Sequence, residues 1–395
     1  MASFQKYKTT KGEMWMFKVK LGINPETGKV KHITRRGFKT KKEAQLHASQ
    51  LFQRVSIGKG TIDKKILFTT LIDQWFKQYK ISGIKKSTIL NRETTAIPNL
   101  RKYLGQYPLI KITPIVYQEF LNTMFKKEYS RSTIETLNIV ARLIFNYACK
   151  NGLIVENPTT NAVIPKKVKT IAELKVKSLE ENYLTKKELL KFLNYVQSNA
   201  DTLDYSIFLT LAYTGVRIGE LLALQWEDID FINETISINK TLFRNENRIK
   251  EYELTTPKTN KSNRIILVDK IVLEQLSKIK FEQEKIKAEF PAYYDEHFIF
   301  TKMKGDFAGY PESRRAIGFR LKRYLQKTGI AKNLTLHKFR HTHVSLLAEA
   351  GVDLQTIQER IGHEDSKTTR KVYLHITKEV NKQAVQKFYQ LMNNK

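Results

Sequence analysis

Hydrophobic and polar positions follow different periods in successive parts of the 395-residue chain. Between residues 15 and 38, two runs with strand-like character are separated by residues 24–28, which have the Asn-Pro-x-x-Gly form of a turn. Thr40 and Glu43 then have the spacing of a capping box, which predicts a helix that continues to about Val55. Residues 1–66 are therefore expected to form a small sheet backed by one helix.

Residues 67–165 have the period of helices. In the first helix, apolar side chains recur every three or four positions, at Leu71, Ile72, Trp75, Phe76 and Tyr79. Ser87 is expected to cap a second helix, Pro114 to begin a third and Ser132 to begin a fourth. This pattern predicts a four-helix domain.

A polar, lysine-rich stretch over residues 166–182 has the composition of a linker. Thr185 and Glu188 form a second capping box, which opens the last and largest domain, residues 183–395. Within this domain, three short runs rich in β-formers interrupt the helical pattern, at residues 235–243, 252–256 and 264–268. The expected fold class is mainly α with small β-sheets (α+β), the last domain being mainly helical with a short antiparallel sheet.

Charge adds information about partners. The chain carries 69 Lys and Arg against 39 Asp and Glu, a formal net charge of +30, and its sequence pI is near 9.8. Such an excess predicts attraction to a polyanion, which is either nucleic acid or an anionic membrane surface. The sequence has no run of about 18 apolar residues that would span a membrane, and its N-terminus lacks the apolar core of a secretory signal. Double-stranded DNA is the expected partner.

The positive charge is concentrated near the N-terminus. Residues 1–66 hold 16 Lys and Arg and only 4 Asp and Glu, whereas residues 67–165 hold 13 and 6. The first domain is therefore predicted to be a dedicated DNA-contacting module. The cations expected to contact DNA are Arg35 and Arg36 in this module and Lys85, Lys86, Arg131 and Arg142 on the helical domain. Taken singly, each lysine is typical of an ordinary solvated surface.

The single cysteine, Cys149, lies in a helical stretch and cannot form an internal disulfide, which favours a reducing cytosol. No pattern of His or Asp surrounds it, so the sequence does not indicate a catalytic thiol. No Walker A motif occurs, so the chemistry is not expected to need nucleotide hydrolysis.

The last domain contains residues suited to handling a phosphodiester. Arg217 follows Gly215, where one helix is expected to close and another to begin, and the free backbone N–H groups at such a junction attract anions. Glu220 lies one turn later and is placed to hold the Arg217 guanidinium, although an ordinary structural ion pair is an equal alternative. Lys258 is expected in a turn between two antiparallel strands, and it matters only if that turn reaches a substrate phosphate.

A second group of polar residues lies downstream. His337 and Arg340 are three residues apart, so a helix presents both on one face, where one is suited to proton transfer and the other to holding a phosphate oxygen. His341 and His343 add two imidazoles to which no role is assigned. Their spacing directs them apart, and no cysteine or His-Glu-x-x-His motif supports a zinc site.

The last two candidates follow a short helix predicted over residues 355–361. Taken alone, His363 after Gly362 fits a helix C-cap, and Tyr373 fits an ordinary packing aromatic. In chain order the six polar candidates are Arg217, Lys258, His337, Arg340, His363 and Tyr373. This order, with each residue in its own local context, closely resembles the tyrosine recombinase family, most clearly over residues 185–380.

The resemblance implies a mechanism. Tyr373 would attack the scissile phosphate and give a 3′-phosphotyrosine and a free 5′-hydroxyl. Arg217 and Arg340 would hold the non-bridging oxygens and neutralise the charge that builds in the transition state. Because the phosphotyrosine link conserves the energy of the broken bond, religation would need no ATP.

The remaining candidates would assist that step. Lys258 would protonate the departing 5′-oxygen, and His337 and His363 would contribute hydrogen bonds and proton transfer. Glu220 would support Arg217. No metal or other cofactor is expected, because the two guanidiniums perform the electrostatic work of a divalent ion.

The first two domains also resemble the arm-binding and core-binding domains of phage and conjugative-transposon integrases. The implied activity is integration and excision of a prophage or mobile element by a homotetramer that exchanges strands between two duplexes at attachment sites, in the bacterial cytoplasm. An excisionase and a host DNA-bending protein are further partners of this class. A helix predicted over residues 378–392 is a candidate subunit contact, with packing on its own domain as the alternative.

Three other functions fit part of the pattern. A type IB topoisomerase-like enzyme would use the same residue types to relax DNA without site preference. A basic architectural or regulatory protein would bind DNA without cutting it. A metal-dependent integrase would need clustered acids, and those within residues 226–230 are more typical of solvated residues after a helix.

Overall fold

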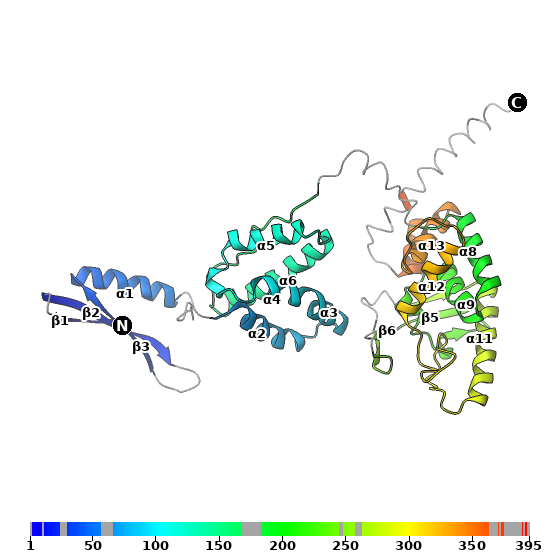
Figure 1. Cartoon of the computed structure of the whole chain (residues 1–395), viewed down its shortest axis with the longest axis horizontal. Helices are drawn as coiled ribbons and strands as arrows, with labels where there is room; N and C mark the ends of the chain where they lie inside the picture. The colour runs from blue at the N-terminus through cyan, green and yellow to red at the C-terminus, as the bar shows by residue number, and fades with distance from the viewer. Residues whose placement is uncertain are drawn as a thin grey trace. The chain divides into compact units, whose positions relative to one another are not determined.

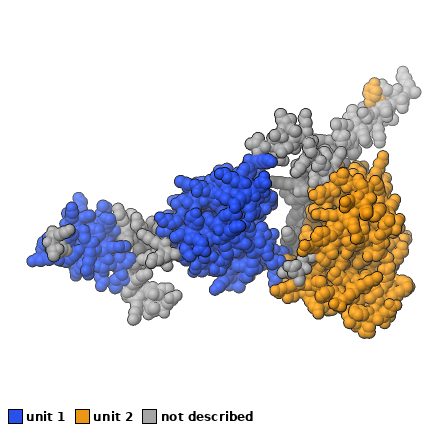
Figure 2. All heavy atoms as spheres, in the orientation of Figure 1, with its two compact units in different colours: residues 1–168 blue, residues 169–395 orange. Residues whose placement is uncertain are grey.

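The computed structural model describes residues 2–9, 12–23, 30–56, 66–167, 183–244, 248–256 and 263–362, together with residues 370, 373, 374, 389 and 392 (Figure 1). The chain divides into two compact units, residues 1–168 and 169–395 (Figure 2). Most of the described elements are helices, and the sheets are small and antiparallel, so the predicted fold class is confirmed. None of the described helices combines the length and the apolar composition of a membrane-spanning segment.

The N-terminal part of unit 1 is a three-stranded antiparallel sheet with one helix. The sheet has the order β1-β2-β3, and the bounds are β1 Ala2–Thr9, β2 Gly12–Ile23, β3 Val30–Phe38 and α1 Lys41–Ser56. Phe17 and Val19 of β2 are buried against Ala44 and Ala48 of α1, whose small side chains let the helix lie close to the sheet. The predicted sheet backed by one helix is therefore present, with the additional strand β1.

The second part of unit 1 is helical. Its elements are α2 Phe68–Lys80, α3 Lys86–Asn91, the π-helix Arg92–Ala96, α4 Ile97–Leu104, a 3₁₀ turn Leu109–Lys111, α5 Pro114–Lys126 and α6 Arg131–Lys150. The π-helix joins α3 to α4 without a break, and Pro98 lies just after it, where a missing N–H and a bulky ring are accommodated by a widened turn. Four helical segments therefore surround one core, in which Phe68 stacks on Phe145 with ring centroids 4.9 Å apart.

Two of the predicted helix starts in this part need correction. Ser87 lies inside α3, whose N-cap is Lys85, and α6 is capped by Ser130, which accepts a hydrogen bond from the Thr133 backbone N–H. The predicted start at Pro114 is confirmed, since Thr113 caps α5. At α6 the sequence offers more than one hydroxyl residue and only the backbone geometry selects the one that caps, whereas α3 begins without a side-chain cap.

Unit 2 is built around a central helix, α9, which is mostly apolar and almost wholly buried (Figure 1). The first helices are α8 Lys186–Asn199, α9 Thr202–Thr214 and the single turn α10 Ile218–Leu221. The later helices are α11 Lys270–Glu289, α12 Arg314–Lys327, α13 Lys338–Glu349 and α14 Leu354–Ile361. The predicted capping box at Thr185 is confirmed, and α8, α11 and α13 pack against α9.

Two small sheets lie between α10 and α11. The strands are β4 Ile229–Asp230, β5 Thr235–Ile238, β6 Thr241–Arg244, β7 Tyr252–Thr255 and β8 Arg264–Leu267. One sheet has the order β4-β5-β8, and the other contains β6 and β7. The predicted antiparallel pairing of the two strands that flank Lys258 is therefore wrong, because β7 and β8 belong to different sheets. Lys258 itself lies outside the described residues.

The single strand predicted over residues 235–243 is also wrong, since it divides into β5 and β6. Lys240 lies between the two strands, and its Nζ is 2.9 Å from Asp228 Oδ2 and 3.2 Å from Glu227 Oε1. Asp228 is buried by this ion pair, so the expectation that all the acids of residues 226–230 are solvated is wrong for this one. Among the described residues, no group of three His, Cys, Asp or Glu could hold a metal ion.

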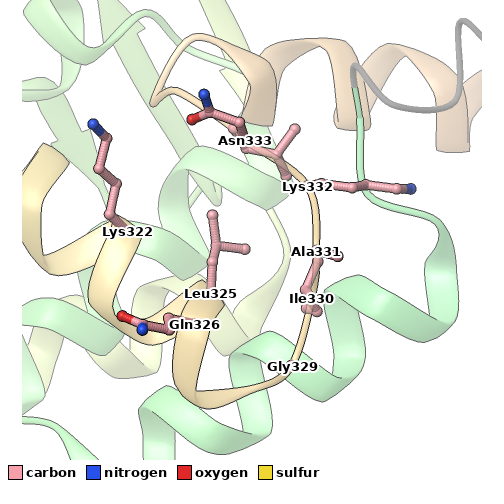
Figure 3. A pocket seen from close by; sticks show the side chains of 9 residues that line it. Lys322, Leu325, Gln326, Gly329, Ile330, Ala331, Lys332 and Asn333 are labelled. Carbon is pink, nitrogen blue, oxygen red and sulfur yellow. The ribbon is translucent and has the colours of Figure 1, made fainter. Parts of the chain in front are cut away.

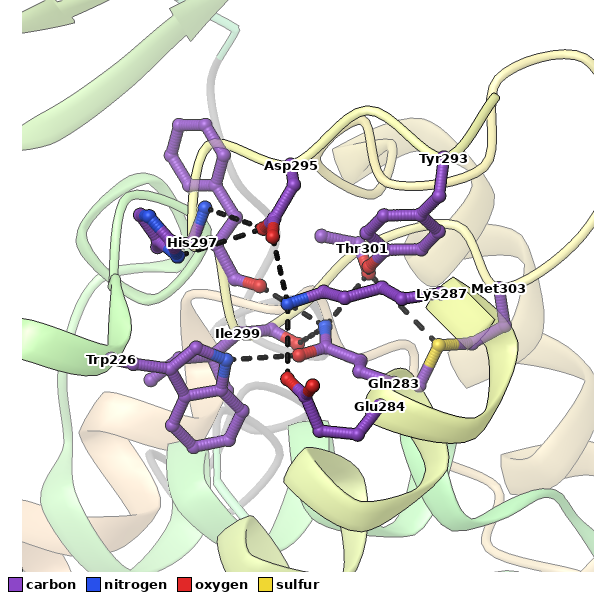
Figure 4. Close-up of polar contacts among 11 residues, drawn as sticks. Trp226, Gln283, Glu284, Lys287, Tyr293, Asp295, His297, Ile299, Thr301 and Met303 are labelled. Carbon is purple, nitrogen blue, oxygen red and sulfur yellow. Dashed lines mark hydrogen bonds and ion pairs between the residues drawn. The ribbon is translucent and has the colours of Figure 1, made fainter. Parts of the chain in front are cut away.

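A polar network fixes the end of α11 to the extended segment that precedes α12 (Figure 4). Gln283 of α11 is buried, and its amide nitrogen donates to the carbonyl oxygens of Phe298 and Ile299, at 3.0 and 2.9 Å. Its amide oxygen accepts a hydrogen bond from the Trp226 indole N–H. These bonds satisfy backbone groups that no regular sheet pairs, so this loop-rich side of unit 2 has a defined conformation.

The linker predicted over residues 166–182 lies outside the described residues from residue 168 onward. The helix predicted over residues 378–392 also lies outside them, apart from residues 389 and 392. Where the described chain resumes at the start of unit 2, the Leu184 backbone N–H donates to Thr342 Oγ1 on α13, at 2.9 Å.

Candidate active site

The junction between α9 and α10 has the form that the sequence predicts. Gly215 closes α9 in the left-handed conformation, with φ of 63°, and Arg217 is the extended N-cap residue of α10. A side chain at position 215 would place its Cβ 2.7 Å from the His343 ring, so glycine is required by both backbone conformation and space. Arg217 therefore stands at a helix start whose first N–H groups lack intrahelical partners.

Glu220 holds Arg217 in place. Its Oε1 lies 2.6 Å from Arg217 Nη1, and its Oε2 accepts from the Arg217 backbone N–H at 3.0 Å. The side chain of Glu220 is 3% exposed and that of Arg217 is 34% exposed, so the pair is buried on the carboxylate side and accessible on the guanidinium side. Burial alone would raise the pKa of the Glu220 carboxyl, but the guanidiniums of Arg264 and Arg217 hold it below its ordinary value. Glu220 is therefore an anion that orients Arg217.

Arg340 approaches the same junction from α13. Its side chain is buried, Nη1 donates to the Gly215 carbonyl oxygen at 2.9 Å, and Nη2 donates to the Ile361 carbonyl oxygen at the end of α14. Its Nε is buried and has no hydrogen-bond partner in the described part of the chain. Burial, together with the charge of Arg217, lowers the pKa of Arg340 to about 9, so the guanidinium stays charged at neutral pH. A cation with an unsatisfied donor at this place is suited to binding an anion.

His337 is the N-cap residue of α13, one turn before Arg340. Burial lowers the pKa of its imidazole below the ordinary value, and the positive charges of Arg340 and Arg217 lower it further. The neutral ring lies against His341, with centroids 5.2 Å apart and planes nearly perpendicular. An imidazole that is neutral at pH 7 is able to accept a hydrogen bond or a proton.

Two cavities adjoin the segment before α13. One, of about 480 Å³, lies beside His337 and is bordered on the α12 side by Arg314, Arg315 and Lys322. The other, of about 420 Å³, lies between the end of α12 and the following loop, where Leu325 and Gln326 face it (Figure 3). The first cavity gives the His337 side of the site a cationic border.

Three residues to which the sequence assigns no role belong to the same cluster. His343 Nδ1 lies 2.9 Å from the Ala212 carbonyl oxygen, and Arg360 Nε lies 3.1 Å from His343 Nε2. Arg264 Nη2 lies 2.9 Å from Glu220 Oε2. No spacing rule points to them, because each acts across elements that are distant in sequence.

Tyr373 packs on a neighbouring surface. Its half-buried ring lies against an apolar cluster made by Tyr183, Val344, Ala348, Ile357 and Ile361. This cluster joins α13 to α14, the two helices that also carry Arg340 and the carbonyl it binds. The structure thus brings Arg217, Glu220, His337 and Arg340 together. Tyr373 packs against the apolar cluster between α13 and α14, next to this group. His363, like Lys258, lies outside the described residues.

The predicted DNA-contact cations are exposed. In the sheet, Arg35 is opposite Phe17 and Arg36 is opposite Met16, so the two arginines lie on opposite faces. Lys85 and Lys86 are at the start of α3. On α6, Arg131 is paired with Glu135 at 2.8 Å, and Arg142 lies eleven positions after Arg131, about three turns along the same face.

Comparison with known proteins gives a consistent result over the whole chain. The profile of the phage integrase family matches residues 182–380, that of an arm DNA-binding domain matches residues 4–54, and that of a phage integrase N-terminal SAM-like domain matches residues 67–125. The integrase of Staphylococcus phage L54a is 34% identical over 83% of this chain and 94% of its own length. The ICEBs1 integrase of Bacillus subtilis is 28% identical over 95% and 96%.

Solved structures give the same fold. The Tn1549 transposon integrase, in complex with transposon right-end DNA, aligns with a TM-score of 0.64 and 22% identity, covering 80% of this chain and 99% of that chain. A lambda integrase tetramer bound to a Holliday junction aligns with a TM-score of 0.56 and 18% identity, covering 93% and 94%. The fold and the family profiles define the class, which is that of site-specific recombinases of the tyrosine type. The chain belongs to the phage integrase family, as its sequence predicts.

Proposed function

We propose that Arg217, Lys258, His337, Arg340, His363 and Tyr373 are the catalytic residues of this integrase. Tyr373 attacks the scissile phosphodiester, its oxygen forms the new bond to phosphorus, and the 5′-oxygen leaves. The product is a 3′-phosphotyrosine and a free 5′-hydroxyl, and attack by a 5′-hydroxyl from the partner duplex reverses the step with exchanged strands.

The observation that carries this proposal is that two neighbouring guanidiniums are held in place by different groups. Arg217 is oriented by a buried carboxylate and remains 34% exposed. Arg340 is buried and bound to two backbone carbonyls, and its Nε has no hydrogen-bond partner among the described residues. A structural ion pair would not need a second cation with an unsatisfied donor beside it. A pentavalent phosphate with extra negative charge is the ligand that such an arrangement stabilises more than the ground state.

The neutral and basic side chains of the site carry out proton transfer and hydrogen bonding. His337, held neutral, accepts a hydrogen bond from the attacking hydroxyl or donates its ring N–H to a phosphate oxygen. Lys258 protonates the leaving 5′-oxygen, and His363 donates a further hydrogen bond. Free tyrosine ionises near pH 10, so a site with several cations assists loss of the Tyr373 proton during attack.

The rest of the chain supplies DNA binding. Arg35 and Arg36 contact arm-type sites, and Lys85, Lys86, Arg131 and Arg142 contact the phosphates that flank the core site. Domains with the boundaries 1–66, 67–165 and 183–395 act as arm-binding, core-binding and catalytic domains. The working form is a homotetramer on two attachment sites in the bacterial cytoplasm, and an excisionase and a host DNA-bending protein set the direction of recombination. The lambda integrase tetramer on a Holliday junction supports this assembly by analogy.

A nicked suicide duplex tests the proposal. It carries the core sequence from a junction between the encoding element and the host chromosome, so that cleavage releases a short fragment and traps the covalent complex. The wild-type protein is expected to form the adduct, also in EDTA, and Tyr373→Phe is expected to form none. An adduct that persists in Tyr373→Phe contradicts the proposal, and so does its absence in the wild-type protein.

A further inference from the structure

Arg264 is a buried cation for which the mechanism above has no use. It is the first residue of β8, and its side chain is 6% exposed. Burying a guanidinium is costly unless it is paired and hydrogen-bonded. The partners of Arg264 therefore indicate what it is for.

Its first partner is the carboxylate that orients Arg217. Arg264 Nη2 donates to Glu220 Oε2 at 2.9 Å, while Glu220 Oε1 binds Arg217 at 2.6 Å. The same carboxylate thus joins one guanidinium that is accessible to another that is enclosed. Arg264 is the fixed side of this arrangement, because its exposed fraction is far below the 34% of Arg217.

Its second partner is the C-terminal end of α14. Arg264 Nε donates to the Arg360 carbonyl oxygen at 2.8 Å, and Arg340 donates to the next carbonyl, that of Ile361. Carbonyls at a helix C-terminus lack intrahelical partners, and cations are favoured there by the helix dipole. A Cβ at Gly362, which has φ of 66°, would lie 3.1 Å from Arg264 Nη1, so the guanidinium packs directly on the glycine. The next residue in the sequence is His363.

We propose that Arg264 is a positioning residue for strand cleavage, whose guanidinium joins the Glu220 carboxylate that orients Arg217 to the end of α14 that leads into His363. A planar guanidinium is required, because Nε and Nη2 point to two different acceptors and an ammonium group cannot hold both in this geometry. The proposal rests on the assignment of Arg217 and His363 to the scissile phosphate.

Loss of the Arg264 guanidinium is therefore expected to slow cleavage by disturbing the position of Arg217. Removing the Arg264 charge leaves the Glu220 carboxylate with Arg217 alone and frees the end of α14. Loss of a supporting group of this kind slows a reaction by about 10- to 100-fold. DNA affinity, which depends on the exposed cations, stays unchanged.

A substrate with an uncharged group at the cleavage position distinguishes a loss of Arg217 positioning from a general loss of protein structure. The suicide duplex is made with phosphate and with methylphosphonate at the mapped cleavage position, so that a methyl group replaces one charged oxygen. Without that charge the reaction depends less on Arg217. The cleavage rates of the wild-type protein, Arg217→Gln, Arg264→Gln and Arg264→Lys are measured on both duplexes.

We expect Arg264→Gln to lose about 10- to 100-fold on phosphate and to recover on methylphosphonate in parallel with Arg217→Gln. Arg264→Lys is expected to show a smaller loss that recovers in the same way, which covers the case in which the glutamine variant does not fold. Cleavage of phosphate at the wild-type rate, or equal losses on both duplexes, overturns the proposal. If the wild-type protein forms no adduct at all, the proposed function fails instead.

Arg320 provides a matched control. It is a largely buried arginine of the same unit, with Nε 2.7 Å from Asp204 Oδ1 and an ion pair to Glu312, neither of which belongs to the site. Arg320→Gln is expected to lower the melting temperature. Any loss of cleavage rate in this variant should be the same on the phosphate and the methylphosphonate duplex. Relief in this variant equal to that in Arg264→Gln also overturns the proposal.

Discussion

Arg360 donates a hydrogen bond from its Nε to Nε2 of His343, 3.1 Å away, and this bond determines the protonation of the imidazole. Because a guanidinium only donates, Nε2 must be the acceptor, and the ring proton is on Nδ1, which donates to the Ala212 carbonyl oxygen. Burial, together with the nearby Arg360 charge, lowers the pKa of His343 to about 4. A neutral histidine therefore joins α9, α13 and α14 beneath the proposed site.

Acidification is expected to destabilise the catalytic unit through this histidine. The folded-state pKa lies below the unfolded value near 6.5, so the unfolded state binds the proton first and stability falls as the pH decreases from about 6.5 toward 4. Between pH 7 and pH 5, His343 accounts for a loss of about 2 kcal/mol. Urea unfolding at the two pH values measures it.

His343→Gln is the matched variant for this prediction. It cannot titrate, so it should be less stable than the wild-type protein at pH 7 and should lose less on acidification. Parallel pH curves for the two proteins would show that His343 is not the group responsible.

Gly215→Ala is expected to destabilise unit 2 by about 3 kcal/mol, because left-handed strain adds to displacement of the His343 ring. The control is Gly329→Ala, since Gly329 has a similar φ of 65° and a Cβ added there would have no atom of the described residues within 4 Å. That variant should show only the strain, about 1 kcal/mol. Equal losses in the two variants would mean that the contact with His343 costs nothing.

Arg217→Gln is expected to slow cleavage by about 10²- to 10³-fold, the usual effect of removing one donor to a developing charge. Glu220→Gln should give a smaller loss, because the amide keeps the shape of the side chain and part of its hydrogen bonding. Single-turnover rates on the suicide duplex measure both. A loss that appears only as weaker DNA binding would place Arg217 outside the chemical step.

DNA affinity is expected to fall steeply with salt, because each phosphate contact releases a counterion. Arg142→Ala should reduce the slope of log K against log salt by about 0.9 if Arg142 contacts one phosphate. Lys278→Ala, which removes an exposed cation from α11, should leave the slope unchanged. Identical slopes for the wild-type protein and Arg142→Ala would remove Arg142 from the interface.

The parts of the fold that depend on local interactions could be predicted from the sequence. Gly215 marks a helix end because only a left-handed residue fits there, and Thr185 marks a helix start because its hydroxyl and the Glu188 carboxylate satisfy free N–H groups. These signals are contained within a few residues of one another. The polar candidates around Arg217 and His337 could be found for the same reason.

The parts that depend on distant contacts could not. Strand β1 alternates weakly and carries lysines, so only its pairing with β2 makes it a strand. The division of β5 from β6 falls at Lys240, whose ammonium pairs with Asp228, 12 positions away in sequence. Arg264, which no motif marks, acquires its role from Glu220 and from the end of α14, 44 and 96 positions away in sequence.

The identity of the attacking residue is the central claim, and peptide mass spectrometry tests it most directly. Trypsin cleavage of the trapped adduct after Lys371 and Lys378 gives a peptide in which Tyr373 is the only tyrosine. We expect the 3′-phosphate of the cleaved strand to be attached to that tyrosine. Attachment to any other residue, or a 5′-phosphate link, would contradict the account.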